Sequence, residues 1–262
     1  MSYADDIGVI NNSLEKLQSF INTLNSYANE VGLFINTKKT KCMTTNQSIT
    51  PLQITINGQK IEQVKEFIYL GHKVSSVNDG SAAVQHRIGL GWAAFQKNKK
   101  ILTSKRVPYH IKAKTYKTYI LPVVLYGLEC VNWTASLCNK IETFQNHIMR
   151  IMLNKKLTDH VTIDHLLKVT GLAPIMAFIK SKTLKLYGHI KRSQTGLSKI
   201  CLEGMITGTR SRGNQKKRWR DNIYEWAELD LHSLNTLTQN RNIWKAISHV
   251  SAHSAIGGES GS

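Results

Sequence analysis

The chain has 262 residues and carries 35 Lys and Arg against 17 Asp and Glu, a formal net charge of +18. Hydrophobic residues make up 41% of it, which supports a folded core and excludes a disordered chain. The longest apolar run, Ile120 to Tyr126, is far shorter than the roughly 20 residues of a membrane-spanning helix, and the N-terminus has no secretory signal. We therefore expect an intracellular protein, in the nucleus or the cytoplasm, with no membrane partner.

The first third of the chain combines one helix with short strands. Apolar residues recur every three or four positions from Leu14 to Val31, which predicts an amphipathic helix that ends at Gly32. Strands are expected at 33–35, around 42–43, in a hairpin over 54–61 with an Asn57-Gly58 turn, and at 67–71. This pattern is typical of an α+β arrangement.

From about residue 80 the periodicity becomes helical and stays so. Helices are predicted over residues 80–103, 108–128, 134–153, 160–169, 173–192 and 216–229. The sequence therefore predicts an α+β part over residues 1–75, a helical basic region over 76–196, and a basic C-terminal region over 197–262 that ends in a disordered tail.

Positive charge is concentrated in the middle of the chain. Residues 1–75 and 197–262 have net charges of +1 and +3, whereas residues 76–196 hold nineteen basic and five acidic residues, a net charge of +14. No acid occurs between Asp79 and Glu129. Charge of one sign opposes compaction and is typical of proteins that bind polyanions, most often nucleic acid. A solvated helical face is the alternative interpretation.

The tetrapeptide Tyr3-Ala4-Asp5-Asp6 places two adjacent carboxylates at the tip of a predicted strand–turn–strand. Adjacent carboxylates repel each other, and a bound divalent cation such as Mg²⁺ relieves that repulsion. Enzymes of phosphoryl transfer use carboxylates to hold metal ions that activate the attacking hydroxyl. Taken alone, an Asp-Asp pair can equally be a solvated turn.

Six motifs lie in order along about 220 residues: Tyr3–Asp6, Gly32–Thr40, Phe67–Gly71, Leu125–Glu129 with Trp133, Tyr187–Ile190 with Arg192, and Arg212–Asn222. Together they resemble the C-terminal half of a reverse transcriptase from a non-LTR retrotransposon, a long interspersed element. The terminal motif departs from the family pattern, because Asn214-Gln215 replaces an Arg-Pro. The resemblance implies a partial polymerase palm followed by an all-helical thumb and a basic helical C-terminal region.

In this family the aspartates of the first motif bind the catalytic Mg²⁺ ions, so the resemblance assigns that role to Asp5 and Asp6. The fingers and an earlier palm strand, which supplies a third metal-binding carboxylate, would lie upstream of residue 1. Two metal ions need more oxygen ligands than two carboxylates offer. We therefore expect no polymerase activity from this chain alone.

Two further motifs would contact the substrates. Lys39, or its neighbour Lys38 or Lys41, would face the phosphates of the incoming nucleotide. The primer end would be held by three residues, Tyr69, Leu70 and Gly71. A surface lysine without a role and an ordinary strand-end turn are the alternative interpretations of these two motifs.

The basic segments would lie along the template–primer duplex and contact its backbone without reading sequence. The candidate nucleic-acid-binding residues are Lys97, Lys99, Lys100, Lys105, Arg106, Lys112, Lys114, Lys117, Arg210, Arg212, Lys216, Lys217, Arg218 and Arg220. The aromatic residues among them, Trp92, Phe95, Tyr109, Tyr116 and Tyr119, recur at helical spacing, which indicates that most belong to the core.

Other chemistries find little support in the sequence. Cys130, Cys138 and His147 lack the close pairs that a tetrahedral zinc site uses, so no zinc is expected.

The leading hypothesis is a fragment of an RNA-directed DNA polymerase, with an RNA template, a DNA primer, deoxynucleotides and Mg²⁺ in the complete enzyme. The alternative is a non-catalytic nucleic-acid-binding protein derived from a retroelement. A third hypothesis is a chain without a stable fold, because half a palm leaves strand edges unpaired.

Overall fold

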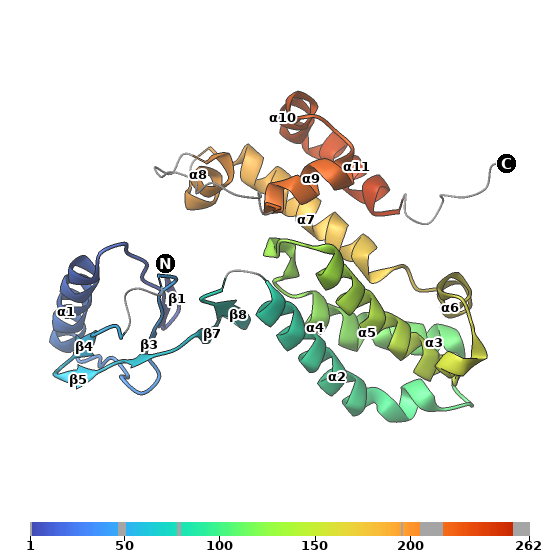
Figure 1. Cartoon of the computed structure of the whole chain (residues 1–262), viewed down its shortest axis with the longest axis horizontal. Coiled ribbons are helices and arrows are strands. Elements are labelled where there is room, and N and C mark those ends of the chain that lie inside the picture. Colours follow the sequence, from blue (N-terminus) through green and yellow to red (C-terminus); the bar gives the residue numbers. More distant parts are fainter. Residues whose placement is uncertain (1, 47–50, 78–79, 195, 205–216, 254–262) are drawn as a thin grey trace. The chain divides into compact units, whose positions relative to one another are not determined.

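A computed structural model describes residues 2–46, 51–77, 80–194, 196–204 and 217–253 (Figure 1). The chain divides into two compact units, Met1–Ala82 and Ala83–Ser262, called unit 1 and unit 2 below. Unit 1 combines short strands with one helix, and the described part of unit 2 is helical. The predicted α+β class is therefore confirmed.

Unit 1 contains helix α1 (Leu14–Glu30), whose first turn is capped by Ser13: the Ser13 hydroxyl accepts a hydrogen bond from the Lys16 N–H. Its described strands are short and pair two by two. The antiparallel pairs are β1 (Ser2–Tyr3) with β2 (Asp6–Ile7), β4 (Thr55–Ile56) with β5 (Gln59–Lys60), and β7 (Glu66–Tyr69) with β8 (His72–Ser75). Strand β3 (Lys41–Cys42) pairs in parallel with β6 (Glu62–Gln63).

The core of unit 1 is small. Its buried centre consists of Ile54, Ile56 and Ile61, against which Leu17 and Ile21 of α1 pack partly buried. The predicted hairpin that supplies these isoleucines is confirmed. Its Asn57-Gly58 turn has φ values of 50° and 75°, as a two-residue type I′ turn requires.

The prediction of a strand at 33–35 is wrong, because the start of this segment forms the C-terminal end of helix α1. Gly32 adopts a left-handed conformation with φ 74°, and the N–H of Leu33 donates to the carbonyl of Ala28 at 2.8 Å. This arrangement is the Schellman helix end, in which the residue after the glycine closes the last turn. The Leu33 N–H is therefore unavailable to a sheet, and Phe34 remains 81% exposed.

Unit 2 consists of helices. They are α2 (Ser81–Thr103, which begins at the unit boundary), α3 (Tyr109–Thr115), η1 (Tyr116–Ile120), α4 (Leu121–Leu125), η2 (Leu128–Cys130), α5 (Ala135–Leu153), η3 (Leu157–Asp159), α6 (Ile163–Thr170), α7 (Ile175–Arg192), α8 (Leu197–Glu203), α9 (Trp219–Ala227), α10 (Leu231–Gln239) and α11 (Arg241–His253). Five of the six predicted helices are confirmed as single helices. Helices α8, α10 and α11 were not predicted, and the segment 108–128 is not the single helix that was expected. That region instead includes a π-helical turn, η1, before Pro122, which has no N–H to donate.

Helix α7 connects the two hydrophobic cores of unit 2. It contacts α5 and η2 on one side and α9, α10 and α11 on the other (Figure 1). The larger core includes Trp133, Phe144 and Ile148, and the smaller one is built around Tyr187 and Trp244. None of the described helices combines the length and the apolar character needed to cross a membrane.

Candidate functional site

The adjacent carboxylates lie on a two-stranded hairpin. Strands β1 and β2 pair antiparallel with Tyr3 opposite Asp6, and the chain reverses through Ala4 and Asp5, with Ala4 at φ 52°. Both aspartates are exposed to solvent. The predicted strand–turn–strand is therefore confirmed, and it presents the two carboxylates outward.

These two carboxylates do not complete a metal site within the described part of the chain. No group of three or more His, Cys, Asp or Glu that could hold a metal ion occurs among the described residues. Hard divalent cations such as Mg²⁺ take about six oxygen ligands, part of them water. Asp5 and Asp6 can supply two protein ligands, so a two-metal centre would need additional carboxylates from elsewhere.

The hairpin of β7 and β8 contacts the acidic hairpin through Tyr69. Leu70 and Gly71 form the turn between these strands, with φ values of 47° and 74°. The ring of Tyr69 lies against Gly8, directly after β2: a Cβ at Gly8 would be 3.3 Å from Tyr69 Cζ. The structure thus brings two of the predicted site segments together, and the small residue at position 8 permits the contact.

The lysine-rich turn is organised by Asn36. Its side-chain Oδ1 accepts hydrogen bonds from the backbone N–H groups of Lys38 and Lys39, each at 3.1 Å. Of the three lysines considered for nucleotide phosphates, Lys41 forms an ion pair with Glu62. Lys38 and Lys39 are exposed and form no ion pair with any described residue.

Unit 2 carries an exposed basic surface on α2, α3 and the loop between them. Six of the predicted nucleic-acid-binding residues there are exposed and form no ion pair within the described ranges: Lys97, Lys99, Lys100, Lys105, Arg106 and Lys114. Two aromatic residues of the same stretch of the chain, Tyr109 and Tyr119, are 45% and 58% exposed. Phe95 and Tyr116 are buried, as core residues at helical spacing should be.

Two other predicted cations are used inside the unit. Lys112 is only 2% exposed, and its Nζ donates to the carbonyl of Met152 at 2.8 Å, near the end of α5. Burial lowers the pKa of the Lys112 ammonium. The Nζ of Lys117 donates to the carbonyl of Gly171 at 3.2 Å, although its side chain remains exposed. Lys112 therefore adds no charge to the surface.

The C-terminal basic motif is described only in part. Arg210, Arg212 and Lys216 lie outside the described residues. Lys217 forms an ion pair with Glu225, and Arg218 is exposed just before α9. Arg220 lies within the first turn of α9 and is half-buried.

Two residues of this motif that were not among the predicted binding residues, Trp219 and Asn222, form hydrogen bonds with the motif around Leu125–Trp133. Buried Asn222 accepts a hydrogen bond from the Trp133 N–H at 3.0 Å and donates to the Trp133 carbonyl at 2.9 Å. The indole N–H of Trp219 donates to the carbonyl of Glu129 at 2.9 Å. These contacts join two motifs that are about 90 residues apart. The occurrence of both segments among the recognised motifs was the only signal in the sequence.

The motif Tyr187–Ile190 with Arg192 lies on α7 and contacts α10 and α11. A Cβ on Gly188 would overlap the indole of Trp244, whose N–H donates to the carbonyl of Leu184 at 2.7 Å. Arg192 reaches α10 and donates to the carbonyl of Thr238 at 2.8 Å. These motif residues therefore pack and hydrogen-bond with other helices of unit 2.

Comparisons with known proteins agree with the motifs. Residues 1–74 match the reverse transcriptase (RNA-dependent DNA polymerase) family. The chain is also 26% identical over 204 residues to an uncharacterized transposon-derived protein of Caenorhabditis elegans, a match that covers 75% of this chain and 72% of that protein. A comparison with solved structures finds no match.

Proposed function

We propose that the chain is a fragment of a reverse transcriptase from a non-LTR retrotransposon; the reverse transcriptase match over residues 1–74 and the similarity to a transposon-derived protein support this proposal. Unit 1 would then be part of the polymerase palm, and the helices of unit 2 the thumb and the C-terminal region. The support for this assignment is the order of the six motifs together with the contact between the Asp5–Asp6 hairpin and Tyr69.

In the complete enzyme, Asp5 and Asp6 would hold Mg²⁺, which supplies charge stabilisation and nucleophile activation for nucleotidyl transfer. Lys39, with Lys38 as the alternative, would neutralise phosphate charge as a point cation. We expect no incorporation by this chain alone, because two carboxylates cannot hold two metal ions. A chain extended upstream through the fingers and the palm strand with a further carboxylate should incorporate deoxynucleotides in primer extension on RNA, and Asp5→Asn should abolish this incorporation.

The observation that carries the function is the exposed basic surface of unit 2, which we propose binds the template–primer backbone. Its six exposed cations have no ion-pair partner within the described part of the chain. An interface that neutralises about six phosphates weakens by about 10³-fold between about 50 and 200 mM salt. The exposed rings of Tyr109 and Tyr119 could stack on unpaired bases.

Fluorescence anisotropy with a labelled RNA–DNA template–primer tests this binding. Replacing both Lys105 and Arg106 by Glu should weaken binding by at least about 100-fold and flatten its salt dependence. The matched control is the double change of Lys16 and Lys60 to Glu, which alters the net charge equally at exposed positions on α1 and β5 of unit 1. Equal effects of the two changes would contradict the proposed surface.

The second candidate, binding without catalysis, is favoured by the incomplete ligand set around Asp5 and Asp6. It predicts that Asp5→Ala with Asp6→Ala leaves template–primer affinity unchanged. It also predicts that the extended chain still fails to incorporate nucleotides. Incorporation by the extended chain would refute it.

A further inference from the structure

The ring of Tyr109, the first residue of α3, has a buried cation against one face. The Nζ of Lys112 lies over this ring, 5.5 Å from its centroid. That ammonium is itself held in place, because the Lys112 side chain is buried and its Nζ donates to the carbonyl of Met152 at 2.8 Å. A cation is attracted to the π face of an aromatic ring. The protein therefore orients the Tyr109 ring before any ligand binds.

The remaining surface of the ring is open to solvent. Phe95 and Tyr116 are buried in the core, whereas Tyr109 keeps nearly half of its surface exposed. Since Lys112 lies over one face, the other face is available to a ligand. An exposed aromatic face is a platform on which a nucleobase stacks, and fixing its orientation in advance lowers the entropic cost of binding.

One pair of cations precedes the ring in the chain. Lys105 and Arg106 come four and three residues before Tyr109, and both are exposed without an ion pair among the described residues. Three residues of chain span at most about 11 Å, so the backbone of Arg106 lies no further than that from the backbone of Tyr109. The long side chains of this pair can therefore reach a phosphate beside a base that stacks on the ring.

A second pair of cations follows the end of α5, the helix that α3 contacts in unit 2 (Figure 1). Lys155 and Lys156 come three and four residues after Met152, and both are exposed and form no ion pair with any described residue. The acids of the next segment are Asp159, which accepts a hydrogen bond from the Lys156 backbone N–H, and Asp164. The two pairs of cations outnumber these acids. Lys155 and Lys156 were not among the predicted binding residues.

We propose that Tyr109 and these two pairs of cations bind an unpaired nucleotide of a single-stranded nucleic acid. The base stacks on the open face of the ring, and the flanking phosphates are neutralised by Lys105 with Arg106 on one side and by Lys155 with Lys156 on the other. In a duplex each base is already stacked on its neighbours, so a side chain stacks on a base only where the strand is unpaired. The site rests on the proposed nucleic-acid binding of unit 2, which it narrows to a single strand next to α3.

Fluorescence anisotropy of the full chain tests the stacking with two labelled probes of equal length and charge, an oligothymidylate and a strand made of abasic sites. Tyr109→Leu should weaken binding of the oligothymidylate by about tenfold and leave binding of the abasic strand unchanged, because only the first probe has bases. Tyr109→Trp should keep the affinity of the wild type, since an indole also stacks. The control is Tyr27→Leu, at an exposed position of α1, which should change neither affinity.

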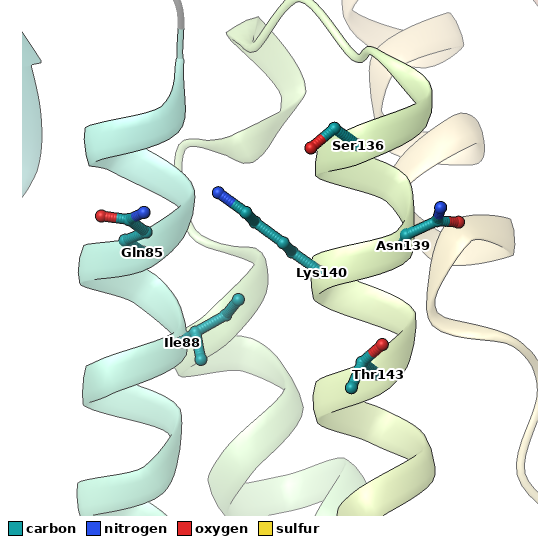
Figure 2. A pocket seen from close by; sticks show the side chains of 6 residues that line it. All are labelled: Gln85, Ile88, Ser136, Asn139, Lys140 and Thr143. Carbon is teal, nitrogen blue, oxygen red and sulfur yellow. The ribbon is translucent and has the colours of Figure 1, made fainter.

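The salt dependence of binding tests the second pair of cations. Replacing Lys155 and Lys156 by Glu should weaken binding of both probes and reduce the slope of log affinity against log salt by about 1.4, at about 0.7 for each lost phosphate contact. The control exchanges Lys140 and Lys185 for Glu, and should reduce the slope by less than half as much. Lys140 stands in the open hollow between α2 and α5 (Figure 2), roughly 18 Å along α5 from Met152, and Lys185 is exposed on α7.

Three outcomes would contradict a part of this assignment. Equal affinities of the wild type and Tyr109→Leu for the oligothymidylate, or equal salt slopes of the two charge variants, overturn the site. Binding of a blunt RNA–DNA duplex but of neither single strand also overturns the site, and leaves the proposed duplex binding intact. Binding of the oligothymidylate through Tyr109 by a chain without affinity for the blunt duplex refutes the proposed duplex binding and leaves the site intact.

Discussion

The two units bury their apolar residues very differently. In unit 1 the fully buried apolar side chains of the described residues are Leu52, Ile54, Ile56 and Ile61, and no residue of α1 is buried. Unit 2 has two extended cores and encloses Trp133, Tyr187 and Trp244 almost completely. Burial of apolar area is the main stabilising contribution to folding, at about 25 cal/mol per Å². Unit 2 should therefore be much the more stable of the two.

The residues proposed for chemistry lie in the unit with the smaller core, and the buried motif residues lie in the unit with the larger cores. The residues proposed for chemistry, Asp5, Asp6 and Lys39, lie on short hairpins and turns of unit 1 that are shaped by local hydrogen bonds and left-handed residues. The motif residues of unit 2, such as Trp133 and Asn222, are held by its core. Burial therefore distinguishes two groups of motif residues: the exposed ones of unit 1, which are proposed for chemistry, and the buried ones of unit 2, which belong to its core.

The largest effect is expected from removing a core anchor in each unit. Trp133→Ala should lower the free energy of unfolding of unit 2 by about 3–5 kcal/mol, and Ile54→Ala that of unit 1 by about 2–5 kcal/mol, through lost burial and cavities. Hydrogen exchange of the full chain, followed amide by amide, measures both. Each variant should accelerate exchange mainly in its own unit; a uniform acceleration throughout the chain would contradict separate cores.

A smaller loss of stability is expected from a substitution at the contact between α7 and α11. Gly188→Ala should cost about 3 kcal/mol, because the new methyl group overlaps the buried Trp244 indole, whose N–H is already bonded to Leu184. Gly89 of α2 is the matched control, since a Cβ there meets nothing within 4 Å. Gly89→Ala should stabilise by about 0.5–1 kcal/mol through helix propensity. Urea unfolding followed by tryptophan fluorescence compares them, and a stable Gly188→Ala would refute the close packing.

The next smaller loss of stability is expected from removing the hydrogen bonds between Asn222 and Trp133, which join two motifs that are distant in the sequence. Asn222→Ala should cost about 2 kcal/mol, because it leaves the buried N–H and C=O of Trp133 without their partner. Asn146 of α5 is half-buried and its side chain forms no hydrogen bond within the described residues, so Asn146→Ala should change stability by less than about 0.7 kcal/mol. Thermal unfolding by circular dichroism separates the two outcomes. Similar melting temperatures would show that the link contributes little.

The smallest effect concerns Tyr116. Its hydroxyl is buried and has no hydrogen-bond partner among the described residues, so Tyr116→Phe should stabilise unit 2 by about 1 kcal/mol at pH 7. Burial also raises the pKa of Tyr116 well above its usual value, and raises that of Tyr187 to about 12.

Because the unfolded tyrosines lose their protons first, at about pH 10, the unfolding free energy of the wild type should fall as the pH rises above 10. Urea midpoints at pH 7 and at about pH 11 measure this fall. Tyr116→Phe should reduce it; an equal fall in both proteins would exclude Tyr116 as its source.

Much of the fold could be predicted because its signals are local. The apolar period of Leu14–Val31 and the Asn57-Gly58 turn each depend on a few neighbouring residues, and both predictions are confirmed. The strand at 33–35 failed because a helix end and a strand compete for the same Leu33 N–H. Helices α10 and α11 were not predicted, because their formation depends in large part on packing against α7, which is distant in the sequence.

By itself the sequence determined the order of the motifs, the similarity of residues 1–74 to reverse transcriptases, the hairpin of Asp5 and Asp6, and the concentration of charge in residues 76–196. All of these are properties of residue identity and spacing. Only the tertiary structure decided which cations stay at the surface. Lys112 and Lys114 look alike in the sequence, yet Lys112 is buried against the end of α5 and Lys114 is exposed. Burial depends on which helices meet, and those contacts join residues that are far apart in the chain.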